Sequence, residues 1–276
     1  MSWHAQLRLD LQRDGVRSVG RFAHEGPLRV LQALYPEGDA ICHNVLVHPP
    51  GGLVGGDVLD VRVHVEPGAH GVVTTPGAAR FYRSDGEAAV QHTRLVLDEG
   101  ARFEWLPHEA ICYSGCRAEN RLAMQLAPGA ELMGWDVCAL GLPAAGQPFG
   151  HGSLLQHVAL GDAWLERGRV RGDDLALLDG PLGFAGRRCL ATLWFAAGSD
   201  LGRERTGRAL DAAREVIEAH QLRDTAGATS PQGQVVVVRA LAPLVEPAMD
   251  LLRSVRDAWR TQLWQLPAVQ PRLWAL

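Results

Sequence analysis

The feature that most constrains the fold is a strand-turn-strand unit that recurs in the first half of the chain. In each unit an alternating run of apolar and polar residues leads into a turn with a central glycine, at Gly68, Gly100 and Gly129. These glycines lie about 30 residues apart, a period at which neighbouring units stack and share one core. The alternating runs are residues 61–65, 93–97 and 121–126, and the apolar segments after the turns are residues 71–75, 102–107 and 131–135. The sequence therefore predicts a mainly β protein with a stacked or β-helical sheet body. A meander of hairpins in a sandwich is the alternative.

The hydrophobic period becomes helical in the last quarter of the chain. Within residues 203–222, apolar residues recur at helical spacing among charged ones, which is typical of an amphipathic helix. A second helix is expected to start near Pro247, because the first helical turn tolerates proline. Its apolar stripe consists of Leu251, Leu252, Val255, Trp259 and Leu263. We expect these two C-terminal α-helices to pack on the β body.

No linker separates the helical tail from the β body. The sequence therefore predicts one domain, residues 1–276, with a β body at about residues 1–200 and an αβα tail at about residues 201–276. Residues 139–152 are rich in glycine, proline and alanine and are expected to form a long ordered loop. Residues 227–234 are expected to be a mobile connector.

The composition excludes several classes of protein. The chain contains no lysine, so it has neither the lysine of a nucleotide-binding P-loop nor the amine of a Schiff-base enzyme. A net charge of -4 favours neither nucleic acid nor an anionic membrane, and no apolar run approaches the length of a membrane span. The five cysteines lack paired spacing and predict no disulfide framework. We expect a cytoplasmic protein with soluble partners.

A glycine-rich loop, His-Pro-Pro-Gly-Gly-Leu-Val-Gly-Gly-Asp at residues 48–57, has a specified backbone path, because glycine permits positive φ and proline restricts φ. It is followed by Thr-Thr-Pro-Gly-Ala-Ala-Arg-Phe-Tyr-Arg-Ser at residues 74–84. Both segments resemble signature segments of the UreD family of urease accessory proteins, also called UreH. Shorter landmarks in the same order extend the resemblance over nearly the whole chain: residues 26–29, 35–38, 42–43, 104–107 and 271–274.

The resemblance implies a scaffold or metallochaperone that is not an enzyme. Such a protein binds UreF directly and the GTPase UreG through UreF, and it helps to deliver nickel to apo-urease. It implies no tightly bound cofactor, with nickel only in transit. A scaffold that serves another metalloprotein is a further possibility.

Candidate nickel ligands are carboxylates in or beside predicted strands, together with one histidine of the glycine-rich loop. Burying a carboxylate is costly unless it is paired, hydrogen-bonded or hydrated, and the resemblance implies an internal nickel passage that would hydrate it. The candidates are Asp57, Asp60, Glu104, Glu109, Glu166 and His48. The alternative is that Arg62, Arg80, Arg102 or Arg167 neutralises the carboxylates in salt bridges. His43 and His48 lie five positions apart and should face opposite sides of a strand.

Arg80, Phe81, Tyr82 and Arg83 form a candidate partner-binding surface, because aromatic residues and arginine are enriched at protein interfaces. The alternative places Phe81 in the core.

A different class of protein, a β-helical metal-dependent hydrolase, would use His108, Glu109 and Cys112. This segment is a near miss for a zincin motif, because it lacks the second histidine and lies in a predicted strand. His108, Cys112 and Cys116 have a spacing that permits a zinc or nickel site. The alternative is that the cysteines are small buried apolar residues.

Overall fold

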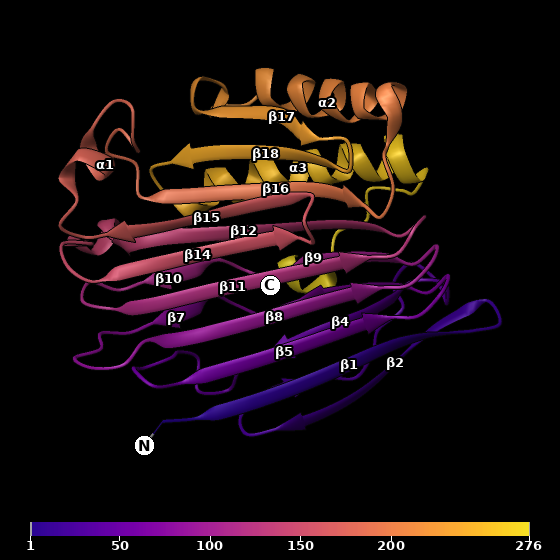
Figure 1. Cartoon of the computed structure of the whole chain (residues 1–276), viewed down its shortest axis with the longest axis horizontal. Coiled ribbons are helices and arrows are strands. Elements are labelled where there is room, and N and C mark those ends of the chain that lie inside the picture. The colour runs from indigo at the N-terminus through magenta and orange to yellow at the C-terminus, as the bar shows by residue number, and fades with distance from the viewer. Residues whose placement is uncertain (1, 276) are drawn as a thin grey trace.

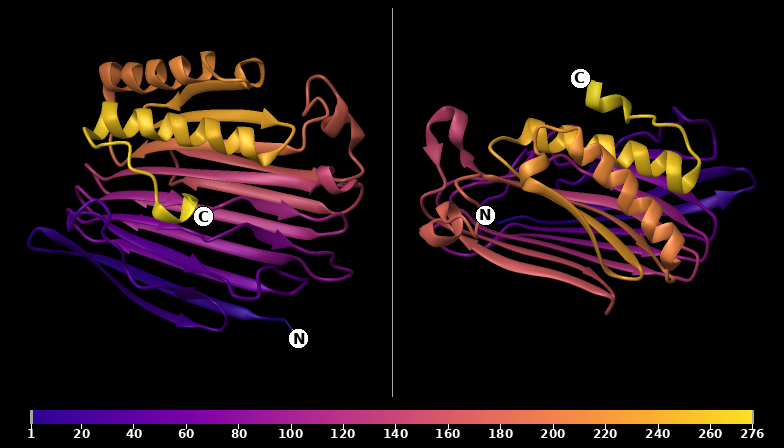
Figure 2. Two further views of the ribbon diagram at one scale, coloured as in Figure 1. Left: turned by 180° about the vertical axis from the view of Figure 1, so that it is seen from behind. Right: turned by 90° about the horizontal axis from the view of Figure 1, so that it is seen from above.

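The computed structural model describes residues 2–275, which form two stacked β-sheets with helices on the outer side of the second sheet (Figures 1 and 2). The first sheet has seven strands in the order β15-β14-β11-β8-β5-β1-β2. Their bounds are β1 His4–Asp14, β2 Arg17–Glu25, β5 Val58–Val65, β8 Ala89–Leu97, β11 Arg117–Leu126, β14 Ser153–Leu160 and β15 Trp164–Arg171. The strands from β1 to β14 pair in parallel, and the antiparallel strands β2 and β15 form the two edges.

The second sheet has eleven strands along the path β17-β18-β16-β12-β9-β6-β4-β3, with β7, β10 and β13 beside it. Their bounds are β3 Arg29–Val30, β4 Cys42–Val47, β6 His70–Thr74, β7 Ala79–Phe81, β9 Arg102–Leu106, β10 Ala110–Cys112, β12 Glu131–Leu142, β13 Gln147–Pro148, β16 Cys189–Ala197, β17 Ala226–Gln232 and β18 Val235–Ala242. Strands β4, β6, β9 and β12 pair in parallel, and β16, β18 and β17 continue the sheet antiparallel.

The chain alternates between the sheets, so that β5, β8 and β11 lie in the first and β6, β9 and β12 in the second. The glycines at the corners, Gly68, Gly100 and Gly129, have φ values of 67°, 67° and 76°, which other residues rarely adopt. The corners are joined by backbone hydrogen bonds such as Gly68 N to Glu99 O at 3.2 Å. The predicted stacked sheet body is confirmed. The sandwich of hairpins is wrong, because the central strands pair in parallel.

Helices α2 (Gly202–Glu218) and α3 (Val245–Trp264) pack on the outer face of the second sheet, which confirms the two C-terminal helices (Figure 2). The expected mobile connector is instead strand β17, which pairs with β18. Most of the expected ordered loop 139–152 is instead regular secondary structure, because β12 extends to Leu142 and pairs with β13. The short helices are α1 Leu175–Asp179, η1 Pro143–Ala145, η2 Arg223–Thr225 and η3 Arg272–Ala275.

Two apolar cores result, one between the sheets and one between the second sheet and the helices. Strand β12 contributes to both, because Leu132 and Cys138 face the first sheet whereas Met133 and Trp135 face the helices. Within residues 2–275, no helix combines the length and the apolar character needed to cross a bilayer.

Candidate functional site

The glycine-rich loop is held against the segment that follows β7. Leu53 N donates to Arg80 O at 2.7 Å, and Tyr82 N donates to Leu53 O at 2.9 Å. A Cβ on Gly52 would lie 2.2 Å from the Tyr82 ring, so only glycine fits there. Asp57 is 3% exposed, and its two carboxylate oxygens accept from Trp3 N at 2.8 Å and Val54 N at 2.9 Å. Asp57 thus fastens the loop to the N-terminal segment.

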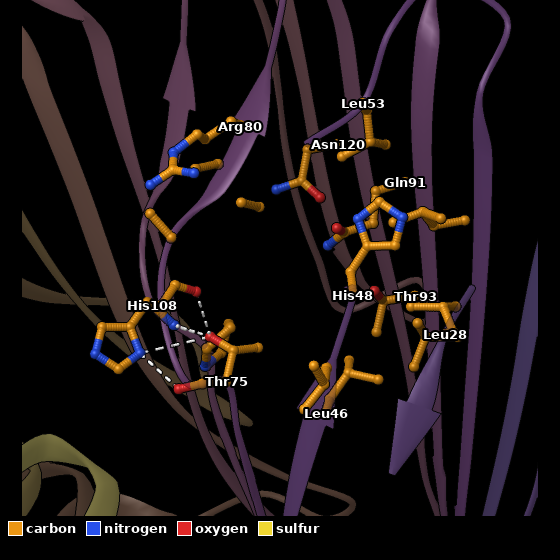
Figure 3. Close-up of a pocket in the computed structure, with 18 of the residues that line it drawn as sticks. Leu28, Leu46, His48, Leu53, Thr75, Arg80, Gln91, Thr93, His108 and Asn120 are labelled. Carbon is orange, nitrogen blue, oxygen red and sulfur yellow. Dashed lines mark hydrogen bonds between the residues drawn. The ribbon is translucent and has the colours of Figure 1, made fainter. Parts of the chain in front are cut away.

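A cavity of about 290 Å³ opens between the two sheets beside this loop. Figure 3 shows His48, Gln91, Thr93 and Asn120 on one side of it and Thr75, Arg80 and His108 on the other. Burial lowers the pKa of His48, which favours the neutral imidazole. The buried His48 Nε2 and Thr93 Oγ1 have no hydrogen-bond partner among residues 2–275. The cavity therefore offers neutral, unsatisfied polar atoms in an otherwise apolar core.

Asp136 lines the same cavity from β12, at a position where the strand faces the first sheet. Asn120 Nδ2 donates to Asp136 Oδ2 at 2.5 Å, and the Cys138 sulfur lies 3.2 Å from Asp136 Oδ1. Burial raises the pKa of the Asp136 carboxyl, and the negative charge of Glu166 adds to this effect. Burial thus makes the ionised form of Asp136 less favourable than it is in water, and the hydrogen bonds to its carboxyl group reduce that effect.

Polar groups continue from Asp136 towards the far edge of the stack. Cys138 Sγ lies 3.3 Å from Gln156 Oε1, and Thr192 Oγ1 donates to Glu166 Oε1 at 3.4 Å. Glu166 also accepts from Arg239 at 2.5 and 2.9 Å and is partly exposed. We call this series the inter-sheet polar row: His48, Gln91, Thr93, Asn120, Asp136, Cys138, Gln156, Thr192 and Glu166. Of the sequence candidates, it contains His48 and Glu166.

Glu104 lies on the opposite face of the second sheet, under α3. Its carboxylate accepts from Arg256 Nε at 2.6 Å and also from Arg260, and all three side chains are 0% exposed. Arg260 also contacts Glu37, which pairs with His43 at 2.8 Å. The two arginines hold the pKa of Glu104 well below its ordinary value despite burial, which by itself would raise it.

We call Glu37, His43, Glu104, Arg256 and Arg260 the α3 ion network. Glu104 is therefore neutralised in salt bridges, but by Arg256 and Arg260 and not by any of the arginines that the sequence suggested.

Two other carboxylates that were candidates lie outside the space between the sheets. Asp60 is on the outer face of the first sheet, where His4 Nε2 lies at 2.8 Å and His92 Nδ1 at 3.2 Å from its oxygens. Glu109 lines an outer groove at the start of α3. His43 and His48 do lie on opposite sides of the second sheet, as expected from their spacing.

The segment Arg80–Arg83 is only partly a surface. Phe81 is 1% exposed in the core, and Tyr82 packs on Tyr113 with ring centroids 5.0 Å apart. Arg80 lines the cavity mouth, and Arg83 pairs with Asp85 at 2.9 Å. The two arginines are the exposed part of the candidate partner-binding surface.

His108 and the two nearby cysteines do not form a metal site. His108 Nδ1 donates to Thr75 O at 2.8 Å, whereas Cys112 and Cys116 are buried in the core between the sheets. Hydrogen bonding with Cys116 and burial raise the pKa of the Cys112 thiol well above its ordinary value. In the described part of the chain, no three His, Cys, Asp or Glu residues are arranged to hold a metal ion.

Sequence reasoning missed Asn120 and Asp136, the centre of the polar row. The signal was available, because Asp136 interrupts a nearly continuous apolar run in a strand that is buried on both faces. Such a residue must be hydrogen-bonded or hydrated.

The fold is a solenoid-like stack of two β-sheets, and comparison with known proteins specifies its family. The family model described as UreD urease accessory protein matches residues 4–275. The urease accessory protein UreD of Polaromonas naphthalenivorans (strain CJ2) is 65% identical over 276 residues, with 100% of both chains covered. UreD of Variovorax paradoxus (strain S110) is 62% identical over 275 residues, again with 100% of both covered. UreD of Methylibium petroleiphilum (strain PM1) is 48% identical, with 99% of both covered.

The chain therefore belongs to the UreD family of urease accessory proteins. Its relatives are named as accessory factors, not as enzymes, so the hydrolase alternative is wrong.

Proposed function

We propose that this protein is a cytoplasmic scaffold that, with UreF and UreG, delivers nickel to apo-urease. It binds UreF directly and UreG through UreF, and it conducts nickel instead of storing it. The nickel is cargo. It travels along the inter-sheet polar row, entering at the cavity beside His48 and leaving near Glu166, or the reverse.

The observation that supports this function best is a row of polar groups that crosses an apolar core. Buried polar atoms without partners are costly, and water or a passing ion would satisfy His48 Nε2 and Thr93 Oγ1. Neutral imidazole, amide and carboxylate groups are ligands that divalent nickel accepts. Because no three strong ligands converge within residues 2–275, an ion is bound weakly at each point and moves on.

Asp136 has the properties of the central group in such a route. Burial raises the pKa of its carboxyl group, so the ionised form is less favourable there than in water. A nearby cation favours the ionised form, so nickel at Asp136 would lower the pKa of this carboxyl group.

The test is Asp136→Ala in a strain that expresses urease and its accessory proteins. We expect the variant to retain UreF, UreG and urease in a pull-down, while purified urease is nickel-poor and inactive. Asp162→Ala, at an exposed turn position, is the matched control and should leave both assembly and nickel content unchanged. Normal nickel loading with Asp136→Ala, or failure of the complex to assemble, would overturn the proposed role of the row.

A further inference from the structure

The outer face of the first sheet is uncovered, whereas the outer face of the second carries α2 and α3 (Figures 1 and 2). Along each strand of the first sheet, side chains that point into the core alternate with side chains that point outwards. The outward set therefore forms a broad surface, and the pairing register decides which of its members lie side by side.

The register aligns three arginines in one line across three parallel strands. Arg8 is the Cα partner of Arg62, and Arg62 is the Cα partner of Arg94. All three residues are exposed. Neighbouring strands lie about 4.8 Å apart, and like charges directly opposite one another are destabilising. In the free protein, repulsion between these arginines lowers the free energy of unfolding. An anion bound to them would compensate for this loss.

Within residues 2–275, an ion pair neutralises only one of these arginines. Arg8 pairs with Asp10 at 2.8 Å, whereas Arg94 has a single hydrogen bond, to Gln125 Oε1 at 2.9 Å. The guanidinium group of Arg62, in contrast, has neither a hydrogen bond nor an ion pair with any residue from 2 to 275. The nearest outward carboxylate on its own strand, Asp60, is held by two histidines. Two adjacent guanidinium groups are thus left available.

The same line continues into a less polar surface. Arg94 is the Cα partner of Ala123, which pairs with Ala159, and Ala159 pairs with Leu165. Leu165 is 59% exposed. A shallow hollow of about 400 Å³ lies at the junction and is lined by residues that include Arg62, Arg94 and Ala123. One line across the sheet therefore offers charge at one end and apolar surface at the other.

We propose that this face docks an acidic segment of a partner protein. Its carboxylates bind between Arg62 and Arg94, and its apolar side chains cover Ala123, Ala159 and Leu165. The planar guanidinium group matches a carboxylate in bidentate geometry, which suits arginine to this task. Nucleic acid fits less well, because the net charge of the chain is -4 and the apolar end of the line has no counterpart in a phosphodiester backbone.

The test uses a short fluorescein-labelled peptide, Glu-Glu-Leu-Glu-Glu-Leu-Glu-Glu, and fluorescence anisotropy without nickel. We expect saturable binding that weakens with salt. The double variant R62E/R94E should bind at least about tenfold more weakly, equivalent to ~1.4 kcal/mol. The matched control R203E/R208E, on the exposed part of α2, should bind like the wild type. A peptide with lysine in place of glutamate should bind R62E/R94E more tightly than the wild type.

Equal binding of the acidic peptide to the wild type, R62E/R94E and R203E/R208E would overturn the proposal. So would tighter binding of a short DNA duplex that is lost in R62E/R94E, because the face would then be a nucleic-acid site. Circular dichroism verifies that each variant is folded. If R62E/R94E does not fold, R62Q/R94Q replaces it, and we again expect weaker binding of the acidic peptide than to the wild type. Since nickel is absent, the outcome is independent of the proposed transfer route.

Discussion

Two sets of buried polar side chains lie on opposite faces of the second sheet, and they differ in charge and in the space around them. Under α3, Glu104 is ionised and held by two arginines, with no exposed side-chain surface. Between the sheets, Asp136 receives hydrogen bonds from an amide and a thiol, beside a cavity where His48 and Thr93 retain unpartnered atoms. Buried ions persist when they are paired, whereas polar groups beside a cavity remain accessible to water or an ion. The partners of a buried carboxylate, more than its burial, distinguish a structural role from a transfer role.

The largest expected effect is the loss of the α3 ion network. Glu104→Ala leaves Arg256 and Arg260 buried without their shared carboxylate, so we expect a decrease of about 3–5 kcal/mol in the free energy of unfolding. Urea unfolding followed by circular dichroism measures it. Asp224→Ala, at an exposed carboxylate, is the control and should change stability by less than about 0.5 kcal/mol. A decrease below about 1 kcal/mol for Glu104→Ala would contradict the structural role of the network.

A smaller effect is expected at the glycine-rich loop. Asp57→Ala removes the acceptors of Trp3 N and Val54 N, so we expect a loss of about 2 kcal/mol in the free energy of unfolding. Urease activation should then decrease only in proportion to the amount of folded protein. The amount of folded protein and the urease activity are measured in the same strain. A stable Asp57→Ala protein that leaves urease without nickel would instead place Asp57 in the transfer route.

The smallest effect is a difference in pH dependence. Pairing with arginine depresses the pKa of Glu104 in the folded protein. Glu104 therefore stabilises the fold at pH values above the pKa that its carboxyl group has in the unfolded chain, and this contribution is lost as the pH falls. Burial raises the pKa of Asp136, so its contribution is present at low pH and is lost as the pH rises through the raised value. We compare the free energy of unfolding of each variant with that of the wild type at the same pH. For Glu104→Gln the loss should therefore be largest near neutral pH. For Asp136→Asn the difference should shift in favour of the variant from acidic to neutral pH. Urea titrations at several pH values measure both, and parallel profiles would contradict the assigned environments.

The repeated glycine corners and the change to a helical period were sufficient to predict the stacked sheets and the C-terminal helices. The partners of Glu104 were not predictable, because Arg256 and Arg260 are more than 150 residues away and meet it only when α3 packs on the sheet. The prediction that Asp60 lines an internal passage was wrong, although the sequence pattern contained the answer. Asp60 lies between the buried Leu59 and Val61 in an alternating strand, so its side chain faces outwards.

The most direct test of the inter-sheet polar row replaces its centre with apolar side chains, in Asn120→Leu/Asp136→Leu. Replacing buried polar groups with apolar ones of similar size is often neutral or stabilising, so we expect an unchanged or higher free energy of unfolding, by up to about 2 kcal/mol. The complex with the other accessory proteins should still assemble. We expect urease matured with this variant to contain little nickel. Full nickel loading with this stable variant would contradict transfer along the row.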